Sequence, residues 1–111
     1  MLITPRHENY DWGTMTWLAD GDAIGASLAE MTVLPGEVSP AHSHQGCNEI
    51  IHLRAGLIEQ RVGAKWVLMQ AGDTVMMSAD VSHQTRNIGQ EIAVMTICYS
   101  SGTRDYQEVS N

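Results

Sequence analysis

The sequence has no phenylalanine and only two cysteines, Cys47 and Cys98. Two cysteines cannot build the disulfide framework on which small secreted domains depend, so that class of protein is excluded. Basic residues are also scarce, with 6 Lys and Arg against 13 Asp and Glu, and they form no cluster. Because the formal net charge is −7 and no basic patch offsets it, we expect no nucleic-acid partner.

Long apolar runs are missing as well. No segment approaches the roughly 20 consecutive apolar residues that are needed to span a bilayer. The N-terminal residues, MLITPRHE, lack the basic and apolar regions of a signal peptide. We therefore expect a cytoplasmic protein with no membrane partner.

Methionine is plentiful where phenylalanine is absent, with 7 residues in a chain of 111. An unbranched Met side chain fills irregular gaps that Phe fills in other proteins, so we expect most of these residues in an ordinary core. A Met-rich ligand pocket is the alternative. The length of the chain predicts one domain covering residues 1–111.

Residues 36–56 read GEVSPAHSHQGCNEIIHLRAG and contain three candidate metal ligands, His42, His44 and Glu49. The two histidines are separated by the strand period, so on an extended segment both imidazoles point to one face. Residues 45–48 supply turn chemistry, and a hairpin there would bring Glu49 back towards the histidines. Two imidazoles and a carboxylate suit a divalent transition metal. Taken alone, however, such a histidine pair is more often on the surface and such a glutamate is more often solvated.

A second stretch changes this balance. Residues 72–87 read GDTVMMSADVSHQTRN, and with residues 36–56 they resemble the two signature motifs of the cupin superfamily. The first motif is filled at every position, by Gly36, His42, His44, Glu49 and Gly56. The second is filled at its Gly, His and Asn positions by Gly72, His83 and Asn87.

Two residues depart from the second motif. Ser78 stands where the family usually has Pro, and Asp80 stands where it usually has Gly. Asp tolerates the left-handed backbone that a turn Gly would adopt, so we expect the turn before His83 to survive the change.

The resemblance implies an all-β fold, a double-stranded β-helix (jelly-roll or cupin) barrel. It also implies one divalent metal ion per chain, Fe, Mn, Ni or Zn, held inside the barrel by His42, His44, Glu49 and His83. Four protein ligands leave an octahedral ion with two open positions, which is typical of a working site, because structural zinc sites are closed and tetrahedral.

The residue pattern itself indicates many short strands and no sustained helical period. If Glu49 faces into the barrel, alternation over residues 49–53 places His52 outside it. We expect an N-terminal arm over 1–14 with a short strand at Leu2–Ile3, and an irregular polar tail over 99–111. The other expected strands cover 15–18, 24–34, 57–62, 65–69, 74–77, 82–87 and 91–98. Turns are expected at 19–22 and at Gly63–Ala64, the latter of type II′.

The cupin resemblance makes a metal-dependent enzyme acting on a small organic molecule the leading interpretation, with dioxygenase-type chemistry preferred. A metal-assisted isomerase, lyase or hydrolase is the alternative within enzymes, and a small-molecule sensor is the alternative outside them. We also expect a homodimer in which residues 1–18 lie on the partner. The other residues have ordinary expected roles. Cys47 is an inert cysteine in a turn, Asn87 bonds local backbone, and Arg86 points outwards into solvent. The remaining side chains either pack in the tail or close the barrel mouth; they are Tyr99, Arg104 and Tyr106.

Overall fold

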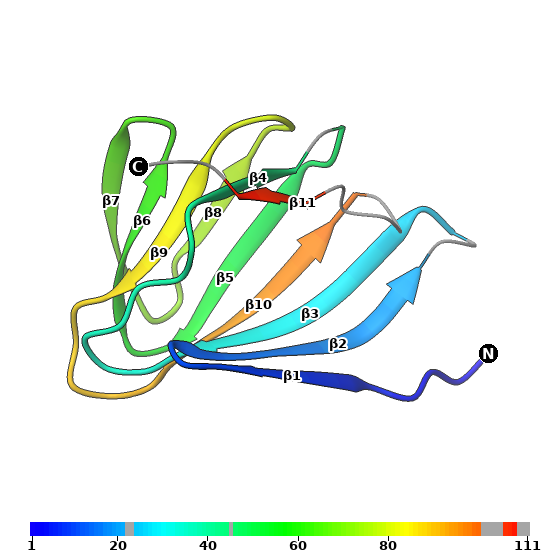
Figure 1. The fold of residues 1–111 in the computed structure, drawn as a ribbon, viewed down its shortest axis with the longest axis horizontal. Helices are drawn as coiled ribbons and strands as arrows, with labels where there is room; N and C mark the ends of the chain where they lie inside the picture. Colours follow the sequence, from blue (N-terminus) through cyan, green and yellow to red (C-terminus); the bar gives the residue numbers. More distant parts are fainter. Residues whose placement is uncertain (22–23, 45, 101–105, 109–111) are drawn as a thin grey trace.

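Two antiparallel sheets face each other in the computed structural model, which describes residues 1–21, 24–44, 46–100 and 106–108 (Figure 1). The larger sheet has the strand order β1-β2-β3-β10-β5-β8. Its strands are β1 Arg6–Tyr10, β2 Gly13–Gly21, β3 Ala26–Val33, β10 Ala93–Tyr99, β5 Glu49–Ala55 and β8 Thr74–Met77. The smaller sheet has the order β11-β4-β9-β6-β7. Its strands are β11 Tyr106–Glu108, β4 His42–His44, β9 His83–Asn87, β6 Leu57–Val62 and β7 Lys65–Gln70.

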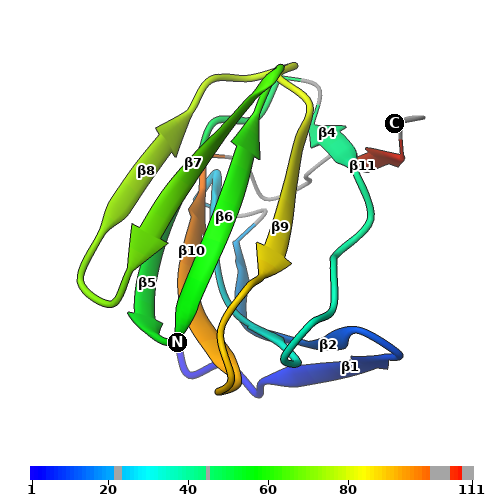
Figure 2. The same ribbon diagram turned by 90° about the vertical axis from the view of Figure 1, so that its left-hand side faces the viewer.

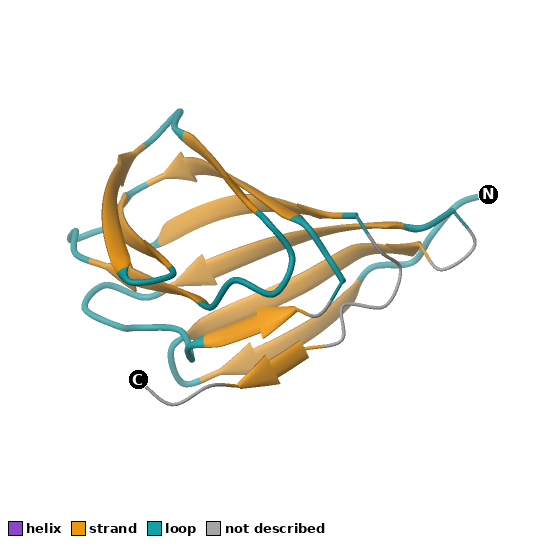
Figure 3. Cartoon of the chain, turned by 90° about the horizontal axis from the view of Figure 1, so that it is seen from above, coloured by secondary structure: helices purple, strands orange, loops and turns teal. Residues whose placement is uncertain are grey.

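The two layers are clear from the side and from above. Figure 2 shows β6, β7 and β9 in front of β5 and β10, with β4 and β11 to one side. Figure 3 shows the same strands from above, with loops only at their ends. The expected all-β jelly-roll fold is therefore confirmed. Within the described residues, no helix is long and apolar enough to cross a membrane.

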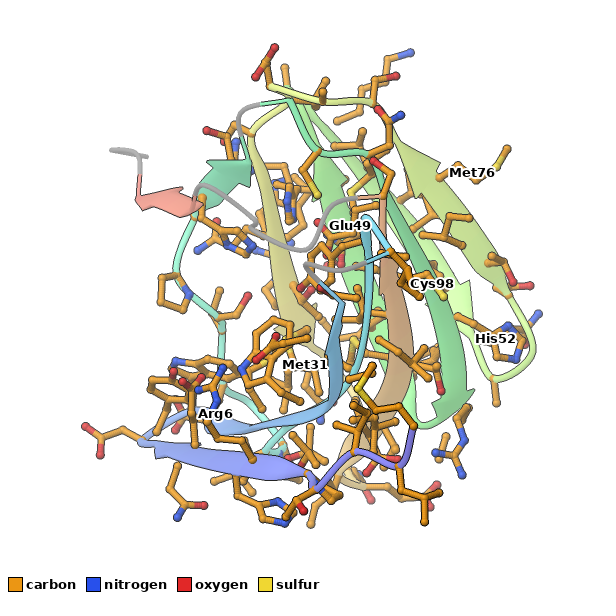
Figure 4. All side chains as sticks on the ribbon, turned by 90° about the vertical axis from the view of Figure 1, so that its right-hand side faces the viewer. Arg6, Met31, Glu49, His52, Met76 and Cys98 are labelled. Carbon is orange, nitrogen blue, oxygen red and sulfur yellow. The ribbon has the colours of Figure 1, made fainter. Side chains whose placement is uncertain are left out.

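Alternation along β5 sets the face that the site uses. Glu49, Ile51 and Leu53 are buried, while Ile50 and His52 are exposed. Successive strand residues point to opposite faces, so the buried set faces the smaller sheet. Figure 4 shows Glu49 directed between the sheets and His52 on the outer side. The register predicted for this strand is confirmed.

Methionine is core material here. Five of the seven methionines are buried and pack with the largest buried residue, Trp17. The buried methionines are Met15, Met31, Met69, Met77 and Met95. The expected core role is therefore confirmed, although Met15 and Met31 also border a cavity between the sheets.

Two turns behave as the sequence predicts. Gly63 joins β6 to β7 with a φ of 63°, as the first central residue of a type II′ turn requires. Asp80 has a φ of 69°, so it does adopt the backbone of the glycine it replaces. Its Oδ1 atom accepts a hydrogen bond from the backbone N–H of Gly46 at 3.2 Å. This bond ties the turn before His83 to the turn before Glu49.

The chain ends differ from expectation. The first strand is Arg6–Tyr10 and not Leu2–Ile3, because β1 pairs with β2 through its backbone, while Leu2 and Ile3 are exposed. Residues 19–21 belong to β2 and not to a turn; a bulge between Trp17 and Ala19 keeps the strand paired. The predicted turn residue Asp22 lies outside the described residues.

The tail is not wholly irregular either. Tyr99 ends β10 as a buried residue, and Tyr106–Glu108 form β11, which pairs with β4. An edge strand such as β4 leaves unpaired backbone groups, which a returning tail can satisfy. Arg104 and the side chain of Tyr106 lie outside what is described. The expected homodimer stays a prediction.

Candidate metal centre

His42 and His83 meet because their strands are neighbours. They are direct register partners of the antiparallel pair β4–β9. Directly opposed residues of such a pair project to the same face. Their ring centroids lie 4.1 Å apart, with the ring planes at 65°. Two of the three predicted histidine ligands thus stand side by side on the inner face of the smaller sheet.

Glu49 reaches the same point from the larger sheet. Its side chain is 3% exposed, and its Oε2 atom lies 2.9 Å from Nε2 of His83, which is itself 4% exposed. One ligand atom from each of His42, Glu49 and His83 fits within a mutual distance of 4.8 Å. Three of the four predicted ligands are therefore brought together between the two sheets.

A backbone contact orients the His42 ring. Its Nδ1 atom lies 2.8 Å from the carbonyl oxygen of Pro40. A carbonyl oxygen can only accept, so Nδ1–H donates and a neutral ring carries its lone pair on Nε2. Metal-binding histidines commonly donate their second ring N–H in this way, which settles ring orientation.

His44, the fourth predicted ligand, lies in β4 two residues from His42. Its side chain lies outside the described residues. The assignment of His44 as a ligand stays a prediction.

The donor set fits a divalent transition metal. Imidazole nitrogen and carboxylate oxygen are ligands for such ions at distances of about 2.0–2.2 Å, and the spacing of the three donors lies within reach of one ion.

The site opens into a cavity of about 310 Å³ between the sheets. Thr85 continues the inner face of β9 beside His83, and its Oγ1 donates to Oε1 of the fully buried Gln60 at 2.5 Å. Other walls are largely apolar or aromatic; they include Trp12, Met15, Met31, Ile51, Ile97 and Tyr99. Such a cavity suits a small organic molecule.

Sequence reasoning missed Glu8, Tyr10 and Trp12, which line the cavity from the N-terminal region. The residues of β1, RHENY, are polar on both faces, so no apolar alternation shows which side chains point inwards. Only the pairing of β1 with β2 reveals it. Tyr99 also borders the cavity.

The other singled-out residues have structural roles. Cys47 is buried in the turn before Glu49. Asn87 donates to the carbonyl oxygens of Glu91 and Val33, so it joins distant as well as local backbone. Arg86 lies on the face of β9 opposite to His83, as predicted, but it is not simply solvated. It donates to Glu59 at 2.7 Å and lies over the Trp66 ring.

Comparison with known proteins agrees with the fold and the motifs. Residues 29–99 match the cupin domain family, and the chain belongs to that family. A curated germin-like protein from Morus alba is 29% identical over 87 residues, which cover 72% of this chain and 41% of that protein.

Solved structures share the fold at low identity. Oxalate decarboxylase from Lactobacillus farciminis superposes with a TM-score of 0.86 at 18% identity, covering 95% of this chain and 33% of that chain. Bacillus subtilis oxalate decarboxylase, in a study of its Mn(II) centres, gives 0.83 at 22% identity and covers 91% and 29%. An uncharacterized conserved protein from Klebsiella pneumoniae with a double-stranded β-helix domain gives 0.83 at 14% identity and covers 94% and 90%. The chain thus spans about a third of the decarboxylase chains.

Proposed function

We propose that this protein is a metal-dependent cupin enzyme that acts on a small organic molecule in the cavity between its sheets. One divalent ion would be held by His42, His44, Glu49 and His83. The observation that carries the proposal is the meeting of His42, Glu49 and His83 donor atoms within 4.8 Å at the wall of that cavity.

The chain's own residues prepare the site. Glu49 supplies carboxylate oxygens that are shielded from water, and the bond to Pro40 holds His42 with Nε2 as its lone-pair atom. Apolar walls limit the water that can enter and strengthen electrostatic interactions inside. When bound, a divalent ion would supply Lewis acidity and, for Fe or Mn, redox chemistry.

Manganese is the first ion to test. Mn(II) centres are named for the decarboxylase of Bacillus subtilis, which has the same fold. Fe, Ni and Zn suit the same ligand set, so ligand type alone does not choose among them. Metal analysis of protein purified without chelator or nickel resin should find close to one divalent ion per chain. No bound ion and no uptake of added Mn, Fe, Ni or Zn would refute the proposal.

Dioxygenase-type chemistry is the reaction we favour, because a bound Fe or Mn ion would supply redox chemistry in a largely apolar cavity. The test is dioxygen consumption by Fe- or Mn-loaded protein with a panel of diketones, phenols and thiols. A lyase is the second candidate, because two of the structurally similar proteins are decarboxylases. A lyase would yield product without consuming dioxygen. In either case His83→Ala should abolish turnover.

A further inference from the structure

Glu8 brings a second carboxylate to the cavity. It pairs in register with Met15 across β1 and β2, so both side chains point to the same face. Met15 is buried, and both residues line the cavity. Glu8 and Glu49 therefore border one space, although they come from strands at opposite parts of the larger sheet.

Hydrogen bonds hold Glu8 in its charged form. Its Oε1 atom accepts from the Tyr10 hydroxyl at 2.8 Å and from Nε1 of Trp17 at 3.1 Å. Its Oε2 atom accepts from Arg6 at 2.6 Å. Partial burial opposes ionisation, but these three donors outweigh it and hold the pKa of Glu8 below its ordinary value.

Arg6 does not cancel this charge completely. It also donates to Asp20 at 3.1 Å, so one cation serves two carboxylates. Arg6 is half exposed and is not part of the cavity wall. Figure 4 shows it over β1, in the N-terminal part of the sheet.

The rest of the wall offers no compensation. Among the described residues that line the cavity there is no Lys or Arg. A divalent ion bound by Glu49 would have its two charges balanced by Glu49 and, in the part that Arg6 leaves uncompensated, by Glu8. A carboxylate ligand would add negative charge to the same largely apolar space as Glu8, where like charges repel more strongly than in water.

We propose that Glu8 makes this cavity select uncharged, partly apolar ligands that carry a hydrogen-bond donor. Carboxylates are disfavoured, including oxalate, after which the structurally similar decarboxylases are named. The donor would bind the Glu8 carboxylate, and the apolar part would pack on Trp12, Met31 and Ile97. The inference deepens the proposed function and rests on it for the ion in the same cavity.

Benzamide and benzoate are matched probes, since they share one shape and differ in charge. Their dissociation constants would be measured by calorimetry on Mn²⁺-loaded and metal-free protein at neutral pH and low salt. We expect the wild type to prefer benzamide, and Glu8→Gln to shift the ratio of the two constants towards benzoate by roughly tenfold. Arg6→Met keeps Glu8 and should shift the ratio the other way, which covers a failure of Glu8→Gln to fold.

Glu59→Gln is the control variant. Glu59 is as exposed as Glu8, at 30%, and also pairs with an arginine, but it lies outside the cavity wall. The inference is overturned if Glu8→Gln leaves the ratio as Glu59→Gln does, or if neither probe binds. A Mn²⁺ titration on the same samples separates the two proposals: metal uptake with an unchanged ratio refutes the role of Glu8 alone. A shifted ratio in protein that binds no metal refutes only the metal-dependent function.

Discussion

Nε2 of His83 lies 2.9 Å from Oε2 of Glu49, although the two residues belong to different sheets. β9 and β5 share no backbone pairing, so this contact exists only because the sheets pack face to face. A metal ion held by both residues would link the sheets. Metal binding should therefore report on the tertiary structure as well as on the ligands.

His83→Ala should lower metal affinity by more than roughly 100-fold, which is the largest effect typical of residues that only hydrogen-bond to metal ligands. It removes a predicted ligand whose ring nitrogen already contacts Glu49. The change deletes a polar group from the cavity wall and no packed hydrocarbon, so the fold should persist. Metal titration measures the affinity, and circular dichroism checks the fold.

His52→Ala is the matched control for this measurement. His52 lies on the same strand as Glu49 but points outwards, where its Nδ1 contacts Thr74 at 2.8 Å. Its loss should leave metal affinity unchanged. Metal loss in His52→Ala with retention in His83→Ala would mean that the assigned face of β5 is not the one that binds.

Glu8 should make stability depend on pH in acid. Its folded pKa is lowered from an ordinary value of 4.5, so its ionised form stabilises the folded state. That contribution is complete above pH 4.5 and is lost as the pH falls through the folded pKa. Urea unfolding of metal-free protein should show wild type and Glu8→Gln converging as the pH falls below 4.5. A gap that stays constant from pH 6 to pH 3 would contradict this.

Asn87→Ala should lower the free energy of unfolding by about 3 kcal/mol, since it leaves buried backbone groups without partners. Asn87 is 1% exposed, donates to the carbonyls of Val33 and Glu91, and accepts from the N–H of Gly89. Asn9→Ala, at an exposed position of β1, should change stability by less than about 0.5 kcal/mol. Equal effects in urea unfolding would show that the Asn87 bonds contribute little.

Gly56→Ala should be more destabilising than Gly63→Ala. Both glycines have positive φ, 95° and 63°, so any side chain meets backbone strain of about 1–2 kcal/mol at either position. At Gly56 an added Cβ would also lie 2.9 Å from Cα of Ala93, whereas Gly63 faces open space. We expect a loss of at least about 3 kcal/mol for Gly56→Ala. A comparable loss for both variants in thermal or urea unfolding would show that strand packing tolerates the methyl group.

Much of this protein can be predicted from sequence because its strands obey local rules. Alternation in residues 49–53 places His52 on the face opposite to Glu49, and Gly63 marks its turn through the backbone angle it permits. Asp80 keeps the turn before His83 because its short polar side chain tolerates a positive φ. The cupin resemblance likewise implies four ligands, and the structure brings three of them together.

Tertiary structure alone decided what surrounds those ligands. The inward position of Glu8 depends on the pairing of β1 with β2, and the strand at 106–108 depends on the open edge of β4. Neither segment has an apolar period, so neither shows its face or its partner in its own residues. When a strand alternates between apolar and polar residues, its own sequence shows which side chains are buried. The neighbour of a polar edge strand is instead set by backbone hydrogen bonding between distant segments.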